Sequence, residues 1–159
     1  MGAKLVWQKK NDNPAKFVVS GDITEFADLG RLQLELGATS ELDLGGIAQV
    51  NSTGVREWMK FMRLVNAAGQ QLVLRRCSVS FVNQLNMIRR FAGGAQVASI
   101  LLPFACIDCE TQTERLLELA PGLDIKATTE ASLPCASCGA NAVFDDLPNI
   151  YFAFLGESN

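Results

Sequence analysis

The chain has 159 residues, of which 48% are hydrophobic and 19% charged, and its formal net charge is −3. This composition supports a packed core and excludes overall disorder. Because no apolar run approaches the roughly 20 residues that span a bilayer, and the start lacks the apolar segment of a signal peptide, we expect a cytoplasmic protein without a membrane partner.

Up to residue 105 the chain alternates between predicted strands and predicted helices, which are recognised by their apolar periodicity. The expected strands are 4–9, 16–20, 41–44, 71–74 and 97–105. The expected helices are 25–36, 52–68 and 78–88. Two strands joined by a turn, followed by helices that alternate with strands, predict an α/β fold in which a mixed or parallel sheet is covered by helices.

Capping residues and glycines indicate where these elements begin and end. Thr24 is a candidate N-cap for the first helix, and Asn51 or Ser52 is one for the second. The pair Gly45-Gly46 is expected to close the central strand. The second helix has an apolar arc wider than one sheet contact requires, which predicts a second layer of cover over it.

Beyond residue 105 both the pattern and the charge change. A short helix is expected at 113–119, then a loop or strand pair, and then a hairpin, or a strand with a short connection, at 141–155. Residues 1–105 carry 12 basic and 8 acidic side chains, a charge of +4, whereas residues 106–159 carry 2 and 9, a charge of −7. This asymmetry predicts two domains with those bounds. The acidic one would repel a phosphate backbone, so no nucleic-acid partner is expected.

Four of the five cysteines form two Cys-x2-Cys pairs, Cys106/Cys109 and Cys135/Cys138. Two residues between thiolates let both sulfurs of a pair bind one ion, and two such turns complete a tetrahedral site. Gly139 follows the second pair, where the positive φ of the turn favours glycine. We therefore expect a structural Zn²⁺ ion in a ribbon-like module, while the spacing alone leaves iron as an alternative.

Two other interpretations of the cysteine pairs have less support. Disulfides would need an oxidising compartment, for which the sequence carries no export signal. A thioredoxin-like redox motif would need only one pair, at the start of a helix that follows a strand. The fifth cysteine, Cys77, lies apart from both pairs and is expected to be a buried structural thiol.

The sequence contains no histidine. This excludes Ser-His-Asp and Cys-His catalysis, metal sites with histidine ligands and the usual proton shuttle near neutral pH. Catalysis by carboxylate, lysine or thiolate stays open. We expect a protein that binds or switches and is not an enzyme.

Three segments, in a fixed order, resemble the STAS domain, the fold of bacterial anti-sigma-factor antagonists. They are Gly21-Asp22-Ile23-Thr24, Leu42-Asp43-Leu44 and Val50-Asn51-Ser52-Thr53-Gly54-Val55. The resemblance covers about residues 4–105 and follows the same element order. With four cysteines directly after the last strand, the chain is similar to bacterial STAS-like proteins that carry a C-terminal four-cysteine ribbon.

In STAS antagonists the first Ser of an Asp-Ser-(Ser/Thr)-Gly segment is phosphorylated by a partner kinase, and Ser52 occupies that position here. Asn51 replaces the Asp, which keeps a capping group but removes a charge. The resemblance implies a signalling module that binds a protein partner, such as an anti-sigma factor, a kinase or another regulator. Asp22, Thr24 and Arg56 are the further candidate contacts. The alternative is that Asn51 and Ser52 only cap the helix.

A second candidate function is small-ligand or nucleotide sensing. In this hypothesis basic side chains bind an anion near the N-terminus of the second helix. The candidate side chains are Arg56, Arg75, Arg76, Arg89 and Arg90.

The aromatic residues near the C-terminus exceed what a hairpin hides alone. They are Phe144, Tyr151, Phe152 and Phe154. We expect them to pack on the first domain, against Phe61 and Leu64, or on a second subunit in a homodimer.

Overall fold

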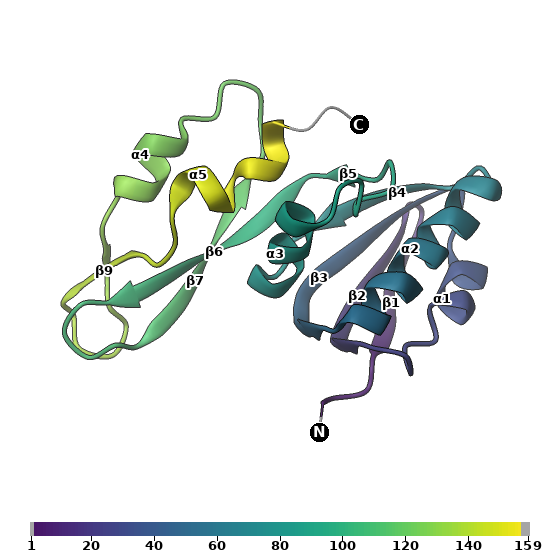
Figure 1. Cartoon of the computed structure of the whole chain (residues 1–159), viewed down its shortest axis with the longest axis horizontal. Coiled ribbons are helices and arrows are strands. Elements are labelled where there is room, and N and C mark those ends of the chain that lie inside the picture. The colour runs from purple at the N-terminus through teal and green to yellow at the C-terminus, as the bar shows by residue number, and fades with distance from the viewer. Residues whose placement is uncertain (1, 157–159) are drawn as a thin grey trace.

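Strands and helices are arranged on two sheets that lie end to end (Figure 1). The computed structural model describes residues 2–156. The strands of the first sheet are β1 (Val6–Asp12), β2 (Ala15–Ile23), β3 (Thr39–Val50), β4 (Gln71–Arg75) and β5 (Gln96–Val97). The helices beside it are α1 (Leu29–Glu35), α2 (Ser52–Ala67) and α3 (Val79–Met87). The second part contains β6 (Ser99–Cys106), β7 (Gln112–Glu118), α4 (Ile125–Glu130), β8 (Leu133–Pro134), β9 (Asn141–Phe144), α5 (Pro148–Tyr151) and a 3₁₀ turn, η1 (Ala153–Gly156).

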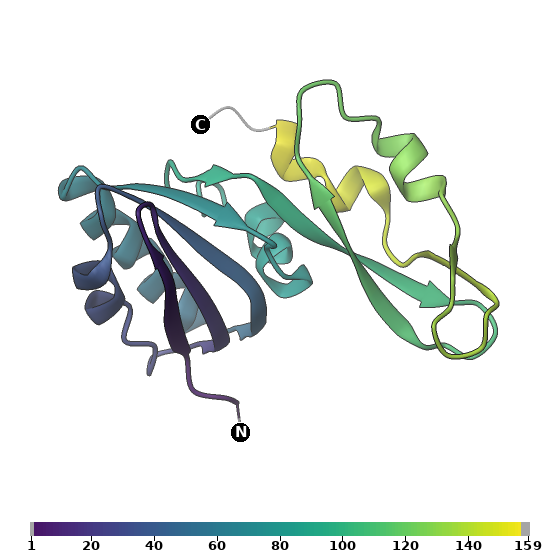
Figure 2. The ribbon, with the colours of Figure 1, turned by 180° about the vertical axis from the view of Figure 1, so that it is seen from behind.

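The first sheet has the strand order β1-β2-β3-β4-β5. β1 and β2 form an antiparallel hairpin, while β2, β3, β4 and β5 run parallel. Side chains alternate along β2, where Phe17 and Val19 are buried but Lys16 and Val18 are exposed. The three helices lie on one face of this sheet, and the view from behind shows the opposite face without a helix over it (Figures 1 and 2). The mixed sheet with helices confirms the predicted α/β class.

Helix α2 packs against the sheet and against the segment that follows α3. Its N-cap is Asn51, whose side chain accepts a hydrogen bond from the Gly54 amide at 2.7 Å. The indole Nε1 of Trp58 donates to the Phe91 carbonyl at 2.8 Å, and the two rings stack with centroids 5.9 Å apart. The segment after α3 therefore supplies the second cover that the wide apolar arc predicts. The large buried side chains of α2 are Trp58, Phe61, Met62 and Val65.

The first helix begins later than predicted. α1 starts at Leu29 because the side chain of Asp28 accepts a hydrogen bond from the Arg31 amide and caps the helix there. Thr24 is not the N-cap, and its hydroxyl instead accepts a hydrogen bond from the Phe26 amide at 3.1 Å in the turn that precedes α1. Phe26 falls within the predicted helix, yet its side chain lies in this turn and is 79% exposed.

The predicted end of the central strand is wrong, because β3 continues through Gly45-Gly46. These glycines lie at an irregularity in the pairing with β2, where Val18 pairs with Asp43 but Ser20 pairs with Gly46. A Cβ atom added to Gly46 would lie 2.6 Å from the Ser20 Cβ. The close approach of the two strands at this bulge explains the glycine, which the sequence pattern alone assigned to a turn.

The second sheet has the strand order β7-β6-β9-β8, and all its pairs are antiparallel. The helix predicted at 113–119 is wrong, because this segment forms β7. β7 pairs with β6 along its length, from Ser99 opposite Glu118 to Ala105 opposite Gln112. The leucine-rich pattern suits a helix locally, but pairing with β7 satisfies backbone groups of β6 that would otherwise lack partners.

The last part of the chain contains more helix than predicted. In place of the expected loop or strand pair, α4 follows its N-cap Asp124, whose side chain accepts a hydrogen bond from the Ala127 amide at 3.0 Å. The hairpin considered for 141–155 is absent, since strand β9 is followed by α5 and η1. Pro148 stands in the first turn of α5, where its missing N–H has no intrahelical partner to lose.

One hydrophobic core includes side chains from both sheets. Strand β6 connects them, because Ile100 forms a parallel bridge with Cys77 beyond β4, while β6 itself belongs to the second sheet. The domain boundary expected between 105 and 106 falls at the end of this strand and stays a prediction. Among residues 2–156, no helix is both long enough and apolar enough to cross a membrane.

The C-terminal aromatic residues pack on α3. Tyr151 and Phe152 are 1% and 5% exposed. The side chain of Asn86, in α3, donates to the Tyr151 carbonyl at 2.8 Å and accepts from the Phe154 amide at 2.8 Å. The expected packing on the first part of the chain is therefore present, but α3 provides the surface instead of Phe61 and Leu64 in α2. Phe61 is buried against Trp58, and Leu64 is 42% exposed.

Candidate functional site

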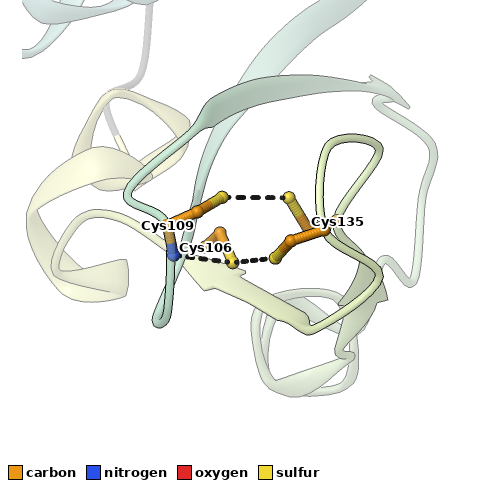
Figure 3. Close-up of side chains that lie close together, drawn as sticks. Cys106, Cys109 and Cys135 are labelled. Carbon is orange, nitrogen blue, oxygen red and sulfur yellow. Dashed lines mark hydrogen bonds between the residues drawn. The ribbon is translucent and has the colours of Figure 1, made fainter.

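The two cysteine pairs come together at one end of the second sheet (Figure 3). All four Sγ atoms lie within 4.8 Å of one another. The Cys106 and Cys138 sulfurs are 3.5 Å apart, and the Cys109 and Cys135 sulfurs are 3.6 Å apart. Disulfide sulfurs would be about 2.05 Å apart, and four sulfurs around Zn²⁺ at about 2.3 Å would be about 3.8 Å apart. The four thiols are unpaired and lie at distances that suit a bound metal ion.

The two turns that carry the cysteines have the same backbone hydrogen bonds. The Cys106 amide donates to the Thr111 carbonyl at 2.9 Å, and the Cys135 amide donates to the Ala140 carbonyl at 2.6 Å. Each turn begins at the end of a strand, the first after β6 and the second after β8. Strand pairing therefore places both turns beside each other, because β6 and β8 both pair with β9.

Each turn is closed by a residue with positive φ. Gly139 has φ 76°, as expected from the sequence, and its amide donates to the Cys135 carbonyl at 2.9 Å. Glu110 occupies the equivalent place in the first turn, with φ 62° and a hydrogen bond of 3.1 Å to the Cys106 carbonyl. The sequence carries no signal for Glu110, since a glutamate rarely adopts this conformation.

Backbone amides also donate to the first sulfur of each pair. The Asp108 and Cys109 amides lie 3.4 Å and 3.5 Å from Cys106 Sγ, and the Ser137 amide lies 3.4 Å from Cys135 Sγ. Backbone hydrogen bonds, first from Cys138 and then from Ser137, lower the pKa of Cys135 and so favour its thiolate, the form that binds a metal. These backbone contacts orient the ligands before any ion binds, as outer contacts do in metal sites.

The surroundings shift the pKa values of two cysteines in opposite directions. Contacts with Thr111, first with its hydroxyl oxygen at 3.0 Å from Cys109 Sγ and then with its backbone, lower the pKa of Cys109 to about 6. A hydrogen bond from the Ala140 backbone favours the Cys138 thiolate, but the sulfurs of Cys106 and Cys109 outweigh it and raise the pKa of Cys138 to about 12. Without a cation the cluster therefore holds both thiolate and thiol, and a divalent cation would favour four thiolates.

Cysteine exposure differs within each pair. Cys106 and Cys135 are 3% and 4% exposed, whereas Cys109 and Cys138 are exposed. The fifth cysteine, Cys77, is 0% exposed, and burial raises its pKa. Its expected role as a buried structural thiol agrees with this position, away from the cluster.

A second set of predicted residues meets at the N-terminus of α2. The Asn51 amide donates to the Ile23 carbonyl at 3.2 Å, which joins the start of the helix to the end of β2. The Asn51 side chain donates to the Glu25 carboxylate at 3.2 Å. These two residues line a surface groove, and Thr24 lines it as well. Ser52 is the first residue of the helix and is exposed. Strand β2 and helix α2 thus bring together residues from two of the motifs singled out in the sequence.

The other predicted contacts differ in accessibility. Asp22 lines the groove but is only 5% exposed, so most of its surface is inaccessible to a partner. Arg56, one turn further along α2, is exposed. Phe26 also lines this groove and was missed as a site residue, because apolar periodicity placed it inside the first helix.

Four of the five arginines proposed to bind an anion lie outside α2, and two of them form ion pairs with carboxylates of β3. Arg75 donates to the Glu41 carboxylate at 3.0 Å, and Arg76 lies 3.4 Å from the Asp43 carboxylate. Asp43 pairs with Arg75 in the first half of β3, whereas α2 begins after the C-terminal end of that strand, at Val50. These ion pairs neutralise both arginines, and only Arg56 of the five belongs to α2.

Comparison of the chain with protein-family models, curated proteins and solved structures found no match. The fold and the cysteine cluster define the class: an α/β protein with helices on one face of a mixed sheet and a four-cysteine cluster that is able to bind a metal ion.

Proposed function

We propose that this chain is a non-enzymatic regulatory module of the STAS type, which binds a protein partner at the N-terminus of α2, and that its four cysteines hold a structural zinc ion. One observation supports the proposed docking site most directly. Phe26 is 79% exposed and lines the same groove as Asn51, the residue before the candidate switch Ser52. Large aromatic side chains are typical anchors of protein interfaces, where a partner removes them from water.

The order of elements supports the STAS type. From β1 to β5 it is β-β-α-β-α-β-α-β, the same order of strands and helices as predicted, although most of the last predicted strand, 97–105, forms β6 of the second sheet and only Gln96–Val97 completes the first sheet. The segment that resembles the STAS phosphorylation motif begins α2, with Asn51 as the cap and Ser52 as the first helical residue. The segment that resembles the STAS motif therefore has the local geometry that phosphorylation requires, a serine at an exposed helix N-terminus.

Phosphorylation of Ser52 would change the charge of this surface without unfolding α2. A phosphate adds about −1.5 to −2 of charge at neutral pH, and the free amides and dipole of a helix N-terminus accommodate it. The new charge would lie near Glu25, which already accepts a hydrogen bond from Asn51. Repulsion of Glu25 and attraction of Arg56, one turn along the helix, would alter the groove that receives the partner.

The docking site is tested with a photo-crosslinking side chain. We would replace Phe26 with p-benzoylphenylalanine and irradiate the full chain in cells of its source. Leu34, in α1, is equally exposed at 79% and serves as the matched position outside the groove. We expect one regulatory protein to crosslink at position 26 and not at 34, and to be lost when Ser52→Asp is added. Equal crosslinking at both positions would contradict the proposal.

The metal is tested by elemental analysis of the purified chain. We expect one zinc ion per chain and no visible absorption, because Zn²⁺ has a filled d shell. Cys77→Ala should keep the ion, since Cys77 is outside the cluster, whereas Cys109→Ser should lose it. Stoichiometric iron with a coloured thiolate band would overturn the identity of the metal.

A further inference from the structure

Two sulfur–sulfur contacts cross from one cysteine turn to the other. They join Cys106 to Cys138 at 3.5 Å and Cys109 to Cys135 at 3.6 Å, the latter two labelled in Figure 3. Each contact pairs a buried cysteine with an exposed one, since Cys106 and Cys135 are buried while Cys109 and Cys138 are exposed. An oxidant from solvent therefore meets one sulfur of each contact, and a second sulfur lies directly behind it.

We propose that the four-cysteine cluster is a modification site for hydroperoxides, at which oxidation forms two disulfides that cross between the turns, Cys106–Cys138 and Cys109–Cys135. The inference goes beyond partner docking. It rests only on the geometry of the cluster.

The chemistry needs two thiolates and one hydroperoxide for each disulfide. The exposed thiolate of Cys109 attacks the distal peroxide oxygen, so the O–O bond breaks, hydroxide or alkoxide leaves, and the sulfur becomes a sulfenic acid. The Cys135 thiolate then attacks that sulfur, which forms the S–S bond and releases hydroxide. Two electrons pass from the two sulfurs to the peroxide. Cys138 and Cys106 react in the same way with a second peroxide, after Cys138 has released its proton to water.

The required movement is small. Closing a contact of 3.5 Å to a disulfide of about 2.05 Å moves the sulfurs together by about 1.5 Å. Both disulfides link the turn after β6 to the turn after β8. They would therefore keep these two turns together when no thiolate is left to bind a cation. Disulfides within each pair, Cys106–Cys109 and Cys135–Cys138, would leave the two turns unconnected. The pairing therefore decides whether the oxidised protein keeps its fold.

The experiment titrates the full metal-loaded chain with hydrogen peroxide. Metal release is followed with a chromogenic chelator, and disulfides are mapped by mass spectrometry without reduction. We expect loss of all the bound metal and of four of the five free thiols, with about two equivalents of peroxide consumed, the two crossed disulfides as the main products, and an unchanged far-ultraviolet spectrum. Buried Cys77 should stay reduced and serves as an internal control.

Three outcomes would overturn the proposal: disulfides within the pairs, oxidation to sulfinic acid without disulfides, or retention of the metal until the chain unfolds. In Cys138→Ser we expect only Cys109–Cys135 to form, and a Cys106–Cys109 product would count against the crossed pairing. A parallel titration of the chelator-treated chain shows which cysteines form disulfides, whichever metal the purified chain contains. A wrong assignment of zinc can therefore be distinguished from a wrong disulfide pairing.

Discussion

Gly54 allows α2 to lie directly against the end of β2. A Cβ atom at this position would overlap the backbone carbonyl of Ile23, and backbone atoms cannot move aside cheaply. The same contact brings the Asn51 amide to the Ile23 carbonyl. The glycine of the Ser-Thr-Gly segment therefore has a packing role, independent of whether Ser52 is modified.

Replacing Gly54 with alanine should destabilise the fold. We expect Gly54→Ala to lower the free energy of unfolding by about 3 kcal/mol, because overpacking against a fixed backbone is costly. Gly30→Ala is the matched control, since Gly30 lies in α1 with open space around it. That change should raise stability by about 0.5–1 kcal/mol through helix propensity. Urea unfolding of both variants measures the difference, and equal midpoints would contradict the close contact.

Metal binding by the cluster should release protons, and the number should depend on pH. Ligand thiols must lose their protons, and at pH 7.5 Cys138, with a pKa of about 12, still carries one in the metal-free chain. Cys109, with a pKa of about 6, is already a thiolate there and becomes protonated only as the pH falls through 6. We expect more protons released at pH 5.5 than at 7.5, together with weaker binding. Calorimetry in buffers of different ionisation enthalpy measures this number.

At the scale of elements, α3 is the helix beside the first sheet that contacts the C-terminal segment. Asn86 makes one hydrogen bond to the Tyr151 carbonyl and one to the Phe154 amide, both at 2.8 Å. The Tyr151 hydroxyl donates to the Leu101 carbonyl in β6, so α5 is connected to a helix and to a strand. A single asparagine thus joins segments that are far apart in the chain.

Asn86→Ala should loosen this connection. Loss of two hydrogen bonds, with a partly buried carbonyl and amide left unpaired, should cost about 2 kcal/mol of unfolding free energy. Asn83→Ala, on the exposed side of the same helix, should have little effect. Hydrogen exchange should become faster in residues 151–156 of the Asn86 variant. Unchanged exchange there would show that aromatic packing alone holds the segment.

The elements that the sequence predicted correctly are those with strong local signals. Helix α2 runs from Ser52 to Ala67 with its cap at Asn51, and Gly69 has φ 68° where the helix was expected to stop. The helix that the sequence predicts at 113–119 is instead strand β7. Its state depends on β6, a partner whose backbone hydrogen bonds no local pattern reveals.

At the scale of the whole molecule, the strand that leads to the cysteine cluster shares one core with the helical layer. Phe104 in β6 and Tyr151 in α5 belong to the same hydrophobic cluster as Trp58 in α2. β6 ends at Cys106, a member of the cysteine cluster. Loss of the metal is therefore expected to affect more than the turns that bind it.

Chelation should destabilise both parts of the chain together. We expect a lower thermal midpoint and a single transition, with faster hydrogen exchange in β9, in α5 and also in α3. Exchange in α1, at the far side of the first sheet, should change least. Adding zinc back should restore the original rates. Two separate transitions, with α3 unaffected by the chelator, would show that the parts unfold independently.

The sequence by itself determined the local features of this protein: the α/β class, the cap of α2, the two Cys-x2-Cys turns and the buried Cys77. These depend on residues a few positions apart, so spacing and residue type are sufficient. Only the tertiary structure decided that β3 continues through its glycines, that residues 112–118 form a strand, that Phe26 lies in an exposed groove and that the sulfurs pair across the turns. Each of these depends on a partner distant in the chain, which becomes available only when the sheets form.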